Sequence, residues 1–209
     1  PSFTYNIAGS YDVTLTVEKH LGETRTFDYG GLEVEARIIE ERSYVDGRLA
    51  EVSFHYLAQD DRGNVAYFGE VSWEYDDGED ATPEEDSWLV GGATQATDPP
   101  EAFNAGEPTI YMVADPQVGD TFQQQMFPNS DETLTVVAVG DVVRTPAGTF
   151  QTAVRIKETS NADPAPPEYF WVAEGVGVIK EAARNSRSAV IATDLLAAEV
   201  DLESEVSKR

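Results

Sequence analysis

The segment from His55 to Tyr75 constrains the fold more than any other part of the chain. Two runs rich in aromatic and β-branched residues flank a cluster of turn-forming residues at 60–64. This arrangement predicts a β-hairpin, because glycine and asparagine tolerate the positive φ angles that tight turns require. Strict alternation along the second run would place Tyr67 and Trp73 on one face. An aromatic face of that size needs a large partner surface.

The same alternation of apolar and polar residues recurs along most of the chain. The run 11–19 reads as a half-buried strand, and 32–44 also alternates, although its Glu, Arg and Ala content would suit a helix. Short runs of the same kind, separated by turn signals, lie at 24–29, 109–113, 121–127, 133–139, 148–157, 169–173, 178–183 and 188–196. Short strands separated by regularly spaced turns predict an all-β fold, either an antiparallel barrel-like sheet or a strongly curved one.

We expect residues 1–209 to form a single β domain, since 209 residues can bury a core that needs no disulfide staple. The acidic and Pro/Gly-rich stretch 76–108 contains no regular apolar pattern and is expected to form a long loop that closes over the sheet. The tail 197–209 is expected to extend a strand or to fray.

The charge balance excludes some classes of partner. The chain has 39 Asp and Glu residues against 14 Lys and Arg residues, for a formal net charge of -25, and no cysteine. Such a field repels phosphate backbones, so nucleic acid is not expected as a partner. No apolar run has the roughly 18 residues of a membrane span. The first residue, Pro1, suggests a processed N-terminus, and with it an extracellular or periplasmic location.

Five short motifs, in order, resemble a family of bacterial secreted proteins and lipoproteins of unknown function. They begin with the segment 56–70, which contains Tyr-Leu-Ala-Gln-Asp, Gly-Asn-Val and Tyr-Phe-Gly-Glu, and continue with Ser87-Trp88 near two glycines. The remaining three are Pro-Gln-Val-Gly-Asp at 116–120, Pro-Ala-Gly-Thr-Phe at 146–150 and Gly-Val-Gly at 175–177. The resemblance implies an exported, β-rich domain, with a lipid anchor in the precursor as an option, and it implies no particular reaction. Ala66 stands where an aromatic residue is usual, and the acidic stretch 79–86 is an addition.

Few residues point to specific chemistry. Neither His20 nor His55 has a second histidine at metal-binding spacing, and His55 is expected to face solvent. Nucleophile elbows, phosphate loops and dinucleotide fingerprints are absent. No cofactor is required by the sequence, but oxygen-rich side chains around the 60–64 turn could hold Ca²⁺, with a plain turn as the alternative. The candidate calcium ligands are Asp60, Asp61, Asn64 and Glu70.

Three functions remain compatible with these residues. The first is a non-catalytic exported domain that binds an apolar small molecule or a partner protein through aromatic side chains. The second is a barrel-type hydrolase or cyclase that uses a cavity carboxylate or His55, and the third is a calcium-stabilised surface or assembly protein. The aromatic residues that would line a ligand site, unless they simply pack the core, are Tyr56, Tyr67, Trp73, Trp88, Tyr111 and Trp171.

Overall fold

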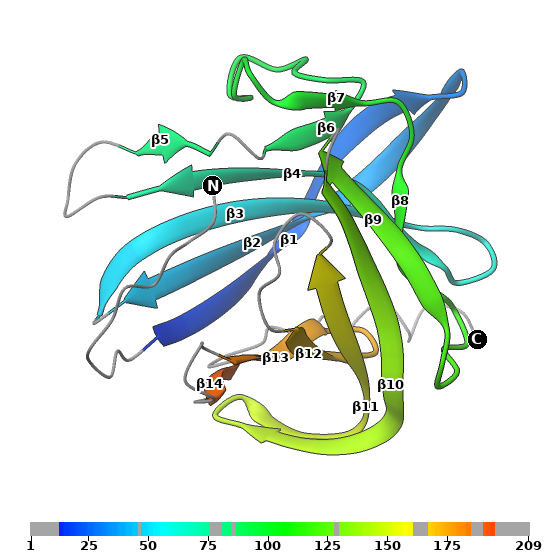
Figure 1. Cartoon of the computed structure of the whole chain (residues 1–209). Coiled ribbons are helices and arrows are strands. Elements are labelled where there is room, and N and C mark those ends of the chain that lie inside the picture. Colours follow the sequence, from blue (N-terminus) through cyan, green and yellow to red (C-terminus); the bar gives the residue numbers. More distant parts are fainter. Residues whose placement is uncertain are drawn as a thin grey trace.

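The computed structural model shows an all-β protein, in which two curved sheets face each other (Figure 1). The structure describes residues 13–45, 47–75, 81–84, 87–127, 130–160, 167–184 and 190–194. Within these ranges no residue is helical, so no helix there could cross a membrane. The expected all-β, barrel-like fold is therefore confirmed. The expectations for Pro1, for most of the acidic stretch 76–86 and for the tail 197–209 concern residues outside the described ranges.

The first sheet, sheet A, is a strongly curled half-barrel built around β3 and β4. All its pairs are antiparallel except β6 with β7. In the described residues its strand order is β1 (Val13–Tyr29), β2 (Leu32–Val45), β3 (Arg48–Gln59), β4 (Val65–Glu74), β6 (Trp88–Val90) and β7 (Phe103–Ala105), and both β5 (Thr82–Pro83) and β8 (Thr109–Met112) also pair with β4.

The second sheet, sheet B, is an antiparallel meander in which each strand pairs with the next along the chain. The long hairpin of β10 and β11 curves beneath β12 and β13, so that β10 also contacts β13 (Figure 1). Its described strands are β9 (Thr121–Phe127), β10 (Ser130–Thr145), β11 (Gly148–Ser160), β12 (Glu168–Ala173), β13 (Gly177–Arg184) and β14 (Val190–Asp194).

The two sheets meet at both edges, which makes the arrangement barrel-like. Strand β8 of sheet A contacts β9 of sheet B, and β1 contacts β14 at the opposite side. The connection from β8 to β9 is fixed by Asp120, whose carboxylate accepts a hydrogen bond from the backbone N–H of Gln117 at 2.9 Å. The N–H of Gly119 donates to the carbonyl of Val136 at 2.9 Å, which ties this connection to β10.

Most of the sequence motifs that resemble the secreted family lie at turns. The 60–64 cluster joins β3 to β4, 116–120 joins the two sheets, 146–150 turns β10 into β11, and 175–177 turns β12 into β13. Gly175 and Gly177 have φ angles of 73° and 105°, which explains the choice of glycine there. These motifs therefore account for chain reversals, and none of the four places a reactive side chain.

A β-bulge in β4 decides which side chains face which side of sheet A. Tyr56 pairs with Gly69 and Leu57 pairs with Tyr67, so Phe68 is an extra residue on β4. Directly paired residues share a face, and the bulge shifts the alternation by one position. The prediction that Tyr67 and Trp73 share a face was therefore wrong, because uninterrupted alternation cannot register an inserted residue.

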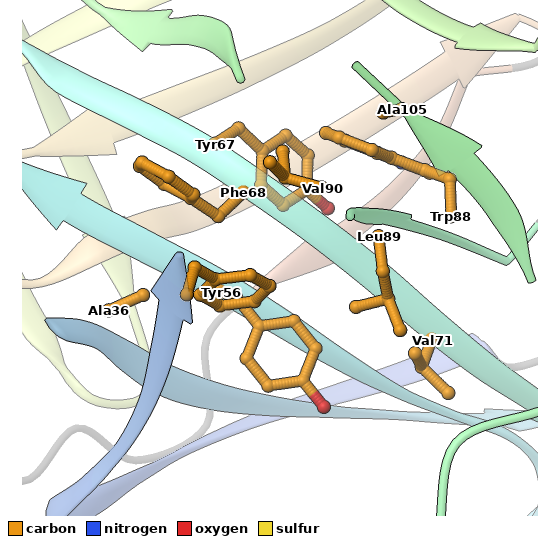
Figure 2. Packing of buried hydrophobic residues seen from close by; sticks show 10 residues of the cluster. Ala36, Tyr56, Tyr67, Phe68, Val71, Trp88, Leu89, Val90 and Ala105 are labelled. Carbon is orange, nitrogen blue, oxygen red and sulfur yellow. The ribbon is translucent and has the colours of Figure 1, made fainter. Parts of the chain in front are cut away.

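The 91–102 loop lies against the apolar face of sheet A, where Asp98 and Thr94 accept hydrogen bonds from Arg25 of β1. The buried residues of sheet A form a contiguous core that also includes Tyr67 and Trp88 from its other face, and partly buried side chains such as Phe54 pack on it. Figure 2 shows nine of the core residues with labels. Core members include Phe27, Ala36, Tyr56, Tyr67, Phe68, Val71, Trp88, Leu89, Val90 and Ala105. The described part of the segment 76–108, which was expected to be an irregular loop, therefore contributes the strands β5, β6 and β7.

Arg25 fastens the 91–102 loop to this face. Its side chain and that of Asp98 are each only 3% exposed, and the guanidinium donates to both carboxylate oxygens of Asp98 at 2.7 and 2.9 Å. The same carboxylate accepts the backbone N–H groups of Thr94 and Gln95, both at 2.8 Å. The guanidinium also lies 5.0 Å from the ring centroid of Tyr56. This buried ion pair is therefore the main polar anchor of the loop.

A candidate ligand-binding site between the two sheets

The face of sheet A that is turned toward sheet B carries a cluster of ionisable side chains. His55 on β3 pairs with Glu70 on β4, and the bulge brings Tyr67 to the same face. The Tyr67 hydroxyl donates to Glu70 Oε2 at 2.9 Å and lies 2.6 Å from His55 Nδ1. Because the Tyr67 hydroxyl donates its only proton to Glu70, the Nδ1–H of His55 acts as the donor to the Tyr67 oxygen. Glu41 of β2 completes the group, with Oε2 3.6 Å from His55 Nε2.

His55 is neither solvent-facing, as the sequence suggested, nor fully enclosed. Its side chain is 19% exposed, and those of Glu41 and Glu70 are 21% and 22% exposed. Burial by itself would lower the pKa of His55, but the negative charges of Glu70, Glu41 and Glu181 outweigh it and raise the pKa to about 9. His55 is therefore a cation at neutral pH. The solvent-facing prediction failed because alternation cannot show that a second sheet lies opposite.

Sheet B contributes carboxyl groups to the same space. Burial, followed by the charges of Glu132, Glu168 and Glu70, raises the pKa of Glu158 to about 8. Burial, followed by the charges of Glu41 and Glu168, raises the pKa of Glu181 well above its ordinary value, and the charge of His55 opposes this shift. Glu41, Glu70 and His55 belong to sheet A, so these influences act across the gap between the sheets. We call Glu41, His55, Tyr67, Glu70, Tyr111, Glu158 and Glu181 the inter-sheet cluster.

Aromatic side chains border the inter-sheet cluster. The ring of Tyr67 meets those of Trp88 and Tyr111 edge to face, with centroid distances of 5.0 and 5.5 Å, and Figure 2 shows Tyr67 beside Trp88. Trp88 pairs directly with Glu70 and so leaves the sheet on the same side. Burial, followed by the negative charge of Glu41, raises the pKa of Tyr111 above its ordinary value. Its hydroxyl therefore stays protonated.

A buried serine track extends the polar surface of sheet A. Ser72 donates its hydroxyl to Ser53 Oγ at 3.0 Å, and its backbone N–H donates to Ser87 Oγ at 3.1 Å. All three serines are at most 4% exposed. The inner surface of sheet A is therefore polar over several strands, whereas the aromatic core lies largely on its other face.

The structure brings together three of the six aromatic residues expected to line a site. Tyr67, Trp88 and Tyr111 border the inter-sheet cluster, as described above. Tyr56 and Trp73 belong to the covered face of sheet A. Trp171 lies on sheet B, where Arg155 and Lys180 are each 5.9 Å from its ring centroid. No sequence pattern distinguishes Glu41, Glu158 or Glu181, since each is one of 39 acidic residues.

The four candidate calcium ligands do not come together. Asp60 accepts hydrogen bonds from the backbone N–H groups of Arg62 and Asn64, both at 2.9 Å, as in a plain Asx turn. The Asn64 side-chain amide donates to Asp60 and its oxygen accepts from Ala114 N–H at 3.0 Å, while Asp61 is exposed. Glu70 points instead to Tyr67. Among the described residues, no three His, Asp or Glu side chains are placed to hold a metal ion.

Comparison of this chain with protein-family models, curated proteins and solved structures gives no match. The fold and the inter-sheet cluster therefore define the class: an all-β, barrel-like protein with ionisable groups facing each other between two sheets. The resemblance to secreted bacterial proteins remains a prediction.

Two groups of the inter-sheet cluster predict that the protein loses stability as pH rises. His55 and Glu158 both have pKa values in the folded state, about 9 and about 8, above their ordinary 6.5 and 4.5. Each therefore binds its proton more tightly when folded, so its stabilising effect is complete below the ordinary pKa and is lost as pH rises through the folded-state value. Each shift alone corresponds to about 3–4 kcal/mol over the interval from pH 5 to pH 9, so we expect the free energy of unfolding to fall by several kcal/mol.

Denaturant unfolding at pH 5, 7 and 9 measures this dependence. The variant Glu158→Gln should flatten it, because the amide does not titrate. The repulsion among the other negative charges of the protein changes little between pH 5 and pH 9, since carboxyl groups with ordinary pKa values are already ionised at pH 5. Stability that rises from pH 5 to pH 9, or a slope that Glu158→Gln leaves unchanged, would contradict the assignment.

Proposed function

We propose that this chain is a ligand-binding β-domain that holds a small polar molecule between its two sheets. The observation that carries the proposal is the mutual influence of Glu41, His55 and Glu70 on sheet A with Glu158 and Glu181 on sheet B. Ionisable groups with strongly shifted pKa values gather at functional sites. Burying such groups or placing like charges together destabilises the fold, so these arrangements usually serve binding or catalysis. The polar character of these groups favours a polar ligand over the apolar ligand expected from the sequence.

The cluster has a second feature of binding sites, which is partial access. The side chains of His55, Glu41 and Glu70 keep about a fifth of their surface exposed, although the charges around them are strong enough to shift titration. Tyr67, in contrast, is only 2% exposed and holds His55 and Glu70 in place. A rigid support beneath accessible polar groups is the arrangement that orients a small ligand.

The acidic composition and the resemblance to secreted proteins support placing this activity outside the cytoplasm. Partner-protein binding and calcium-dependent assembly have weaker support. The aromatic residues needed for an exposed docking patch are largely packed in the core, and backbone N–H groups of the 60–64 turn already bond the Asp60 carboxylate.

A screen of polar fragments by NMR tests the proposal. We expect bound fragments to shift the His55 ring and Trp88 indole signals. The variant Tyr67→Phe keeps the ring but removes the hydroxyl that joins His55 to Glu70, and should weaken binding about fivefold, the equivalent of one hydrogen bond. Tyr29→Phe is the matched control, because Tyr29 is 36% exposed and lies outside the cluster. Fragments that bind both variants equally, or that shift only turn residues, would refute the proposal.

Acid–base catalysis is a second candidate, favoured by one specific observation. The raised pKa of Glu158, about 8, keeps that carboxyl group protonated at neutral pH, while Glu70 accepts a hydrogen bond from Tyr67. A protonated acid and a second carboxyl group that accepts a hydrogen bond could together transfer protons to and from a bound molecule. Prolonged incubation of a bound fragment with the protein, followed by mass spectrometry, separates the two functions. Chemical conversion that Glu158→Gln abolishes would favour the enzyme, and an unchanged fragment would favour simple binding.

A further inference from the structure

We propose that the ligand held by the inter-sheet cluster is a small organic cation, an ammonium group that carries a hydrogen-bond acceptor close by. This inference rests on the proposed function and specifies its ligand class. It depends on three features of the cluster: an excess of carboxyl groups over cations, a rim of aromatic rings, and the buried indole N–H of Trp88, which has no hydrogen-bond partner among the described residues.

The first feature is a shortage of positive charge. Four carboxyl groups of the cluster, Glu41, Glu70, Glu158 and Glu181, share the space with one cation, His55. Burial and the neighbouring negative charges raise the pKa of the two sheet B carboxyl groups, because the charge of His55 alone does not offset them. A bound ammonium group would lower both pKa values and so favour the ionised carboxylates.

Three other cations of the described residues have partners outside this cluster. Arg25 is paired with Asp98 on the opposite face of sheet A. Arg155 lies 3.4 Å from Asp141, and both Arg155 and Lys180 lie over the ring of Trp171.

The second feature is the aromatic rim. Tyr67, Trp88 and Tyr111 meet edge to face beside the carboxyl groups. Ammonium groups are attracted to the faces of such rings, and carboxylates next to aromatic rings are the usual setting for binding organic cations. A bare divalent metal ion fits less well, because the carboxyl groups come from opposite sheets and no three of the described residues are arranged to coordinate one.

The third feature points to an acceptor on the same ligand. The Trp88 side chain is fully buried, and its Nε1 has no hydrogen-bond partner among the described residues. Trp88 leaves the sheet on the side of Glu70 and His55. An indole N–H can only donate, and a buried donor without a partner costs about 1–3 kcal/mol, so a ligand oxygen would relieve this cost.

Four probes that differ in one group each test the ligand class. They share a phenylethyl body: 2-amino-1-phenylethanol, its neutral analogue 1-phenylethane-1,2-diol, its anionic analogue mandelate, and 2-phenylethylamine, which lacks the hydroxyl. Affinities are measured by calorimetry, with calcium chloride alone as a further arm. We expect the amino alcohol to bind at least about tenfold more tightly than the diol and mandelate, and about fivefold more tightly than 2-phenylethylamine.

Charge variants and the titration of His55 localise the binding. Glu70→Gln should lower the affinity for the amino alcohol about tenfold and leave the diol unaffected, because it removes charge and preserves shape. Glu33→Gln, at an exposed position of β2, is the matched control and should change neither. Binding of the cation should also lower the NMR-measured pKa of His55, since a second positive charge disfavours its protonated form.

The outcomes separate this inference from the proposed function. Binding of the diol or mandelate as tightly as the amino alcohol, with the His55 signal shifted, would overturn the cation class and leave the binding function standing. Stabilisation by calcium chloride alone, with no effect of either amine, would also overturn it. If no probe shifts the His55 or Trp88 signals and the fragment screen finds none that does, both proposals fail.

Discussion

Replacing Arg25 by alanine is expected to lower the free energy of unfolding by about 3–5 kcal/mol, since it leaves a buried carboxylate without its partner. Asp98 has a side chain that is 3% exposed, and it accepts two charge-assisted hydrogen bonds from Arg25. Without the guanidinium, its negative charge remains enclosed among the residues of the 91–102 loop, and the aromatic rings of Phe27 and Tyr56 lose the cation above them.

Denaturant unfolding at neutral pH measures the effect, with Arg155→Ala as the matched control. Arg155 also contacts an aspartate and an aromatic ring, but its side chain is 39% exposed, so its removal should cost less than about 1 kcal/mol. The double variant Arg25→Met with Asp98→Leu should recover most of the loss, because it removes both charges. Equal costs at Arg25 and Arg155 would mean that the Arg25 ion pair is not shielded from water.

The loss caused by Arg25→Ala should also shrink in acid. Burial tends to raise the pKa of Asp98, but hydrogen bonds from Arg25 and from backbone N–H groups outweigh it and lower the pKa below its ordinary value. The ion pair therefore contributes its full stabilisation above the ordinary pKa of an aspartate and loses it as pH falls through the folded-state value. The two proteins should converge in stability at low pH.

Replacing Gly69 by alanine is expected to cost about 3 kcal/mol, because the added methyl group has no room. A Cβ at this position would lie 2.7 Å from the carbonyl oxygen of Trp88 and 2.8 Å from Leu89 Cδ2. The first of these is backbone of the neighbouring strand β6, so the clash is relieved only if β4 and β6 separate. The φ angle of 154° at Gly69 adds backbone strain for any other residue.

The matched control for this variant is Gly91→Ala. Gly91 has a φ angle of 81°, but a Cβ there would meet no atom within 4 Å, so it measures the backbone cost alone, about 1 kcal/mol. Gly69→Ala should also move Glu70 relative to His55, and the NMR-measured pKa of His55 should fall with the loss of that neighbour. Equal destabilisation by the two variants would show that β6 is not packed as closely on β4 as the structure has it.

Alternation along the chain was enough to predict strands, and the reason is local. In β2, the side chains of Leu32, Val34, Ala36 and Ile38 repeat with a period of two, and that period overrode the helical propensity of its Glu and Arg residues. Turn residues with positive φ angles, such as Gly63 at 91°, marked the reversals correctly. The candidate site could not be found in this way, because its members come from six strands.

The sequence by itself determined the class of fold, the position of the hairpin turns and the excess of negative charge, since these depend on neighbouring residues and on composition alone. Only the tertiary structure decided which side chains of sheet A face sheet B and which lie on its opposite face. The extra residue Phe68 reverses the alternation within β4, and only the pairing of β3 with β4 reveals it. It likewise decided that Glu181 influences His55 and that Glu70 influences Glu158, because electrostatic influence depends on distance in space, and those residues are far apart along the chain.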